Sequence, residues 1–187
     1  MIRSFIAFEI PEEIRAKVHE TFAPVRRQMS GVKWVEPQGM HLTLRFLGPV
    51  EEAVIEGSIA PLLEKVSADE SSFLLQVKGV GVFPSLSKPR VFWLGMDDGQ
   101  GRLKRLQIKI EAGVSKLPVH QEERAFHPHL TLGRVKVPDR KNPWARVLEE
   151  YEKIDFGSFP AAHVILFKSE LTRGGAVYTK LREFKMK

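Results

Sequence analysis

The tetrapeptide His-Leu-Thr-Leu occurs twice in this chain, at residues 41–44 and 129–132, so the two copies lie 88 residues apart in a sequence of 187. On a β-strand, successive side chains point to opposite faces, so each histidine shares a face with its threonine while the leucines occupy the other face. Each copy therefore presents an imidazole together with a hydroxyl. Because imidazole titrates at a pH of about 6.5, one ring can act as base and the other as acid near neutrality.

This set of groups suits a reaction that takes one proton from a nucleophile and gives another to a leaving group. Thr43 and Thr131 can donate hydrogen bonds to phosphoryl oxygens while His41 and His129 move the protons. A zinc site is the chemical alternative, since His127 would share the strand face of His129, with His41 across a cleft. Neither motif contains a carboxylate. We therefore expect catalysis without a metal ion or any other cofactor.

Three further residues are candidates for substrate binding. Arg45 follows His41 by four residues, which puts it on the same strand face, where it could reach a phosphate or be a solvated arginine at the rim. Arg134 follows His129 by five residues and falls on the opposite face unless a β-bulge intervenes, so a structural role or a place at the rim is favoured for it. His127 shares the face of His129, where it could tune that ring or contact the substrate.

Aromatic residues near the motifs could stack on a nucleobase, although aromatics in apolar strands more often belong to a core. The candidates for such stacking are Phe8, Trp34, Phe46 and Phe83.

The composition limits the class of protein. With 43% hydrophobic and 28% charged residues, the chain fits one globular domain, and the net charge of +6 favours polyanionic partners such as nucleic acid. The absence of cysteine excludes disulfides, thiolate metal sites and a cysteine nucleophile. The N-terminal residues lead directly into a strand pattern rather than a signal sequence, and the apolar runs are short. We expect a cytoplasmic protein with no membrane partner.

The elements that must position the two motifs repeat in order along the chain. Apolar patterning and turn signals predict strands at residues 5–8, 32–35, 40–47, 73–82, 91–96, 126–137, 162–169 and 176–183. They predict helices at residues 12–29, 51–66, 101–116 and 143–151, and a turn at Arg173-Gly174-Gly175. The first strand recurs after about 87 residues and the helix that follows each motif after about 90, which matches the separation of the histidines.

This order predicts a single two-lobed domain over residues 1–187, made by internal duplication of units at about 1–88 and 89–187. Strands and helices in this order favour an α+β fold, with two antiparallel sheets facing a central cleft and helices on the outside. Both histidines and both threonines would line the cleft, and the motif leucines would pack against the helices. A self-contained fold of this kind favours a monomer.

The sequence also resembles the two-histidine phosphoesterase superfamily and, within it, the RNA 2′,3′-cyclic phosphodiesterase family, historically called 2′-5′ RNA ligase. The segments that carry the resemblance are residues 3–7, Trp34, residues 41–48, 81–84, 89–91, 126–134 and 169–171, and Tyr178. They occur in order over nearly the whole chain.

The resemblance implies that His41 donates a proton to the departing ribose 3′-oxygen and that His129 is the base that activates water. It implies that Thr43 and Thr131 hold the non-bridging phosphate oxygens and that the product is a 2′-phosphate, with 2′-5′ RNA ligation as the same path in reverse. Symmetry between the motifs leaves the two histidine roles open on the residues alone. Two alternatives remain: a cyclic phosphodiesterase acting on a small nucleotide, such as ADP-ribose cyclic phosphate or a 2′-5′ oligoadenylate, and a non-catalytic RNA-binding module.

Overall fold

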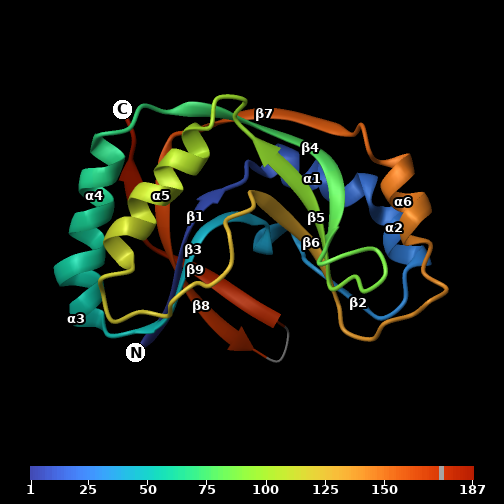
Figure 1. The fold of residues 1–187 in the computed structure, drawn as a ribbon, viewed down its shortest axis with the longest axis horizontal. Coiled ribbons are helices and arrows are strands. Elements are labelled where there is room, and N and C mark those ends of the chain that lie inside the picture. Colours follow the sequence, from blue (N-terminus) through green and yellow to red (C-terminus); the bar gives the residue numbers. More distant parts are fainter. Residues whose placement is uncertain (173–174) are drawn as a thin grey trace.

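The computed structural model describes residues 1–172 and 175–187, and these form an antiparallel sheet with helices on its outer side (Figure 1). The strands are β1 Ile2–Glu9, β2 Val32–Trp34, β3 His41–Val50, β4 Phe73–Phe83, β5 Val91–Asp97, β6 His129–Val135, β7 Asp155–Ala161, β8 His163–Thr172 and β9 Gly175–Lys185. The helices are α1 Glu12–Thr21, α2 Ala23–Gln28, η1 Pro37–Gly39, α3 Glu52–Val54, η2 Ile55–Ile59, α4 Ala60–Ala68, α5 Arg102–Val114 and α6 Trp144–Glu150. The predicted turn at 173–175 falls largely outside the described residues.

Local chemistry accounts for the way the first predicted helix divides. Helix α1 begins after Pro11 with Glu12 and Glu13 in its first turn, where carboxylates interact favourably with the helix dipole. The helix predicted over 12–29 is interrupted at Phe22, and α2 begins with Pro24 in its first turn. Proline lacks the amide hydrogen that would continue the helix, so the chain turns there.

The strands run in the order β7-β4-β5-β6-β3-β1-β8-β9, and every pairing is antiparallel. The short strand β2 pairs with the C-terminal end of β6. The predicted α+β class with helices outside is confirmed. The two expected sheets are joined by one residue pair, Leu42 of β3 with Leu130 of β6, into a single curled sheet. The two motifs therefore meet at the junction between the lobes.

The first lobe, which carries His41, consists of β3, β1, β8 and β9, and the second, which carries His129, consists of β6, β5, β4, β7 and β2. Each lobe takes strands from both halves of the chain. Strand β1 lies between β3 and β8, whereas β5 lies between β6 and β4. Helices α4 and α5 pack together over the first lobe, and α1, α2 and α6 lie on the opposite side of the molecule (Figure 1). The duplication of 1–88 and 89–187 stays a prediction, but neither half makes a lobe by itself.

The strands differ most from the prediction at two places. Strand β7 was not expected, because Gly157 and Pro160 resemble a loop, and it is tolerated as an edge strand that pairs only with β4. Residues 126–128 precede β6 instead of beginning it, since Pro128 has no amide hydrogen for the sheet.

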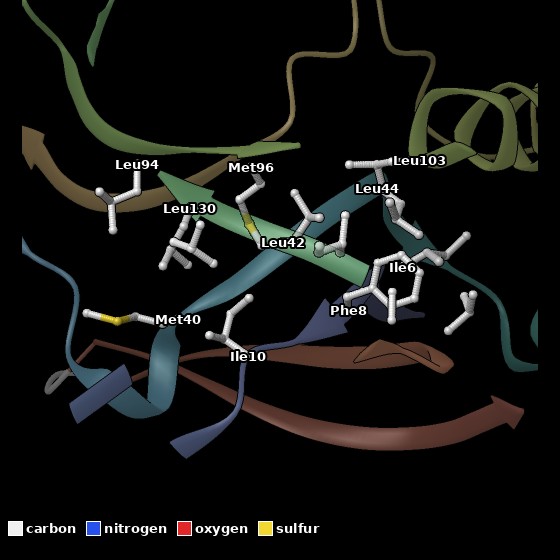
Figure 2. Close-up of a cluster of buried hydrophobic side chains, with 14 of the residues drawn as sticks. Ile6, Phe8, Ile10, Met40, Leu42, Leu44, Leu94, Met96, Leu103 and Leu130 are labelled. Atoms are coloured by element: carbon white, nitrogen blue, oxygen red, sulfur yellow. The ribbon is translucent and has the colours of Figure 1, made fainter. Parts of the chain in front are cut away.

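The motif leucines belong to the main core. Leu42, Leu44, Leu130 and Leu132 are all at most 3% exposed. Figure 2 shows Leu42 and Leu130 in the same cluster of buried side chains as Ile6 and Phe8. Burying a leucine side chain contributes about 2 kcal/mol, so the same residues that pattern the motifs also fix the face on which the histidines lie. No helix in the described ranges is long and apolar enough to cross a membrane.

Candidate active site

Both motifs line one cleft of about 710 Å³ on the face of the sheet opposite this core. His41 and Thr43 come from β3, and His129 and Thr131 come from β6. Because the two strands run antiparallel and pair at Leu42 and Leu130, the motifs approach from opposite directions. The structure thus brings together the four predicted residues, two imidazoles and two hydroxyls, around one space. Their catalytic roles stay a prediction.

A β-bulge falls at the last residue of each motif. In β3 the register with β1 passes from Thr43 directly to Arg45 and skips Leu44, and in β6 the register with β5 skips Leu132 in the same way. A bulge shifts the later residues to the other face of the strand. The fifth residue after each histidine therefore returns to the cleft, and these residues are Phe46 and Arg134.

The bulge overturns the prediction for Arg45. Instead of reaching the cleft, Arg45 is 2% exposed and points to the opposite side of the sheet. Its Nε donates to Glu111 Oε2 of α5 at 2.5 Å and its Nη2 donates to the carbonyl oxygen of His120 at 2.7 Å. Strict alternation along the strand gave the wrong face because it ignored the extra residue.

The corresponding bulge in β6 brings Arg134 into the cleft, where its guanidinium acts on both catalytic candidates. Its positive charge lowers the pKa of His41 and of His129. His127 is not a lining residue of the cleft, but its carbonyl oxygen accepts a hydrogen bond from Nδ1 of His129 at 2.6 Å. The backbone of His127 therefore orients His129, and the charge of His127 also lowers the pKa of that ring.

Both imidazoles are held by the backbone two residues earlier in the chain. His41 bonds to the backbone of Gly39, as His129 does to that of His127. Because a carbonyl oxygen only accepts, Nδ1 of His129 must carry a hydrogen, which leaves Nε2 of the neutral ring free to act as a base. The arrangement fixes the tautomer before a substrate arrives.

Aromatic rings pack against each imidazole. The ring of His41 lies 4.6 Å from that of Phe5 and meets Tyr178 edge to face at 4.9 Å. The ring of His129 meets Phe83 at 5.2 Å. Of the aromatics considered for stacking on a base, Phe46 is 41% exposed and lines the cleft, whereas Phe8 is buried in the core.

Phe5 and Tyr178 were not singled out from the sequence as site residues. Tyr178 belongs to β9, and nothing in the local pattern of that strand indicates that it contacts a histidine 137 positions earlier.

Burial lowers the pKa of both histidines. Desolvation is the largest cause at His41, the hydrogen bond with Gly39 opposes it, and the charges of Arg134 and His129 reinforce it, so that its pKa falls to about 4. At His129 desolvation again lowers the pKa, the bond to His127 opposes it, and the charges of Arg134 and His127 add to the lowering. Both rings are thus neutral at pH 7 in the free protein.

This shift predicts that the protein loses stability in mild acid. Unfolded His41 takes up a proton near pH 6.5, whereas folded His41 does so only near pH 4, so the unfolded state binds more protons between these values. The stability present above pH 6.5 should fall by about 2 kcal/mol between pH 7 and pH 5 through His41 alone. Urea unfolding of wild type and His41→Gln at both pH values measures it. The same loss in both proteins would contradict the assignment.

Positive charge predominates in the cleft. The lining includes Arg3, Arg134 and Lys136, none of which forms an ion pair with a described residue, and Glu122 is the only carboxylate among the described lining residues. Within residues 1–172 and 175–187, no three His, Asp or Glu side chains are grouped closely enough to hold a metal ion. The cleft is therefore suited to an anionic ligand.

Comparisons with known proteins agree with this chemistry. Residues 10–173 match the family model of the 2′-5′ RNA ligase superfamily. The chain is 33% identical to the RNA 2′,3′-cyclic phosphodiesterase of Aquifex aeolicus, over 98% of this chain and 97% of that protein. A solved structure from Thermus thermophilus superposes with a TM-score of 0.83 at 31% identity, covering 99% of this chain and 98% of that one. The E. coli LigT structure with bound 3′-AMP gives a TM-score of 0.80 at 26% identity, with 99% and 98% coverage.

Proposed function

The chain belongs to the 2′-5′ RNA ligase superfamily, and from this premise we propose that it is an enzyme that hydrolyses 2′,3′-cyclic phosphates at RNA ends. The observation that carries the proposal is the meeting of two His-x-Thr pairs in one cationic cleft. A cyclic phosphate carries one negative charge and must pass through a more highly charged five-coordinate state. Arg134 and the two threonine hydroxyls stabilise that charge where it develops.

In the proposed reaction, Nε2 of His129 removes a proton from water as the water oxygen attacks phosphorus. The bond between phosphorus and the ribose 3′-oxygen breaks, and His41 gives its proton to that oxygen. The products are a 2′-phosphate and a 3′-hydroxyl. Thr43 and Thr131 hold the two non-bridging oxygens during the displacement. Ligation would follow the same displacement with a 5′-hydroxyl in place of water as the nucleophile, and the P–O3′ bond would again break to leave a 2′-5′ phosphodiester and a free 3′-hydroxyl.

The lowered pKa of His41 bears on its role as the acid. Since that pKa is about 4 in the free protein, His41 is neutral at pH 7 and lacks the imidazolium proton that an effective general acid donates. A phosphate anion lying between the rings favours their charged forms, because an opposite charge nearby raises a histidine pKa. We infer that His41 takes up its proton as the substrate binds, so that the acid forms only in the complex.

The sequence-based expectations of a cytoplasmic location and a monomer remain part of this proposal. A small cyclic nucleotide is the alternative substrate, and an RNA-binding module is the alternative function.

Product analysis tests the reaction itself. A short RNA with a terminal 2′,3′-cyclic phosphate should yield only the 2′-phosphate, should incorporate one oxygen from ¹⁸O-labelled water into the phosphate, and should react at the same rate in EDTA. The reason is that the imidazoles supply both proton transfers, so no metal-bound water is needed.

Four results would contradict parts of this scheme. A 3′-phosphate product would mean that the 2′-oxygen leaves. Loss of turnover in EDTA would oppose histidine acid-base catalysis as the whole mechanism. Turnover of small cyclic nucleotides without turnover of RNA would move the substrate class to the alternative, and binding of RNA with no turnover of either would indicate a binding module.

A further inference from the structure

Residues 115–128, which join α5 to β6, cross the end of the catalytic strand β3. The amide of His120 donates to the carbonyl oxygen of Leu47 at 3.0 Å. Gly48 has a φ of +73°, and a β-carbon there would lie 3.0 Å from Cβ of His120. The crossing segment thus rests directly on the backbone of β3, a few residues beyond His41.

Arg45 fastens this segment from the other side of the sheet. The side chain of Arg45 is 1% exposed, and its guanidinium bonds at once to Glu111 of α5, to the carbonyl oxygen of His120 and to the carbonyl oxygen of Phe46. Burying a charged guanidinium is costly unless its N–H donors are hydrogen-bonded, so losing any of these three contacts would destabilise the folded protein. Arg45 therefore sets the position of the crossing segment relative to β3.

The result of this fastening is that His120 and Glu122 line the cleft. A carboxylate in a cleft that suits phosphate needs an explanation, since it repels the anion that the neighbouring cations attract. A carboxylate accepts hydrogen bonds and donates none when ionised. In a nucleotide, the groups that offer N–H donors without negative charge are the edges of the bases.

We propose that the segment held by Arg45 reads the nucleobase of the terminal nucleotide, and that Glu122 selects guanine. This inference rests on the proposed function. Guanine presents two adjacent donors, N1–H and the N2 amino group, which match the two oxygens of one carboxylate. The corresponding edges of adenine and cytosine offer an amino group beside an acceptor, and that of uracil offers one N–H between two acceptors. Phe46, exposed on the same cleft, supplies a face on which the base can stack.

The test compares, as substrates, two short RNAs that differ only in ending with a guanosine or an adenosine 2′,3′-cyclic phosphate. The wild type should favour guanosine by roughly tenfold in kcat/KM, because a bidentate pair at an exposed edge discriminates at the low end of its usual range. Glu122→Gln should bring this ratio towards one, because an amide presents one donor and one acceptor instead of two acceptors. Glu123→Gln is the matched control, since Glu123 is the adjacent exposed carboxylate and does not line the cleft, and it should keep the wild-type ratio.

Arg45→Met tests the fastening. As a positioning residue, Arg45 should affect the guanosine substrate mainly through a higher KM, with a smaller change in kcat. The double variant with Glu122→Gln should lose no more guanine preference than Glu122→Gln alone, because both changes remove the same contact. If Arg45→Met does not fold, Glu111→Gln removes one of its anchors from a more exposed position and should lower the preference in the same direction.

Binding of the corresponding product RNAs, which end in a guanosine or an adenosine 2′-phosphate, separates the two proposals. Turnover of both substrates with equal kcat/KM, or a preference that survives Glu122→Gln, overturns the base-reading inference alone. Preferential binding of the guanosine product without any turnover overturns the proposed function and retains the inference. Neither turnover nor preferential binding overturns both.

Discussion

Replacing His129 by alanine should lower kcat on an RNA 2′,3′-cyclic phosphate end by about 10²–10⁴-fold, the usual contribution of a positioned general base. His41→Ala should have an effect of the same order, because the ribose 3′-oxygen is a poor leaving group without a proton. Affinity for the 2′-phosphate product should change much less, since Arg134 and both threonines remain in the cleft. Single-turnover rates and titration with the product measure the two quantities separately.

His163→Ala is the control, because His163 lies beside Glu183 and does not line this cleft. A substrate with sulfur in place of the 3′-oxygen then distinguishes the two roles. A thiol has a pKa of about 8.5 and leaves without protonation, so this substrate should restore much of the rate to His41→Ala and little to His129→Ala. The opposite pattern would exchange the acid and base assignments, and full activity in either alanine variant would remove that residue from the mechanism.

Arg134→Met should lower kcat/KM by about 10²-fold, the usual loss when one preorganised donor to a developing anion is removed. The same change should raise the pKa of both His41 and His129, because the charge of Arg134 lowers each of them in the wild type. Titration of the histidine ring protons by NMR checks the pKa change, and steady-state kinetics checks the rate.

Arg90→Met is the matched control: Arg90 is an exposed arginine that directly precedes β5, the strand paired to β6, and it does not line the cleft. Unchanged histidine pKa values in Arg134→Met would show that its guanidinium does not act on the imidazoles. A similar loss of kcat/KM in Arg90→Met would mean that Arg134 acts only through the general attraction between a basic protein surface and a polyanion.

The sequence predicted the meeting of the four motif residues because two independent signals agreed, the repeated His-x-Thr and the alternation of the leucines. It placed Arg45 on the wrong face because the alternation of side chains between the two faces of the strand was extended past the bulge at Leu44, where that alternation stops. The leucines themselves carry the missing signal: Leu42 and Leu44 are two residues apart, but the next buried leucine is Leu47, three residues on. That change of step indicates a bulge, and the spacing from Leu132 to Val135 repeats it in the second motif.

Other features have no comparable local signal. The contact of Tyr178 with His41 and the hold of Arg45 on His120 depend on strands and loops that meet only in the folded sheet. The pairing of β1 with β8 and of β5 with β4 is equally invisible in a periodic pattern, because patterning specifies which face is buried and not which strand lies alongside.

The exchange of strands between the halves also sets the order in which the two walls of the cleft can be completed as the chain leaves the ribosome. The lobe that carries His129 consists of β2, β4, β5, β6 and β7, and its last strand ends at Ala161. The lobe that carries His41 begins with β1 but needs β8 and β9, which end at Lys185. Strand β1 therefore waits for β8 and β9. Because domains fold as their sequence becomes available, a nascent chain has no complete His41 wall, and hence no paired imidazoles, until Lys185 has been synthesised.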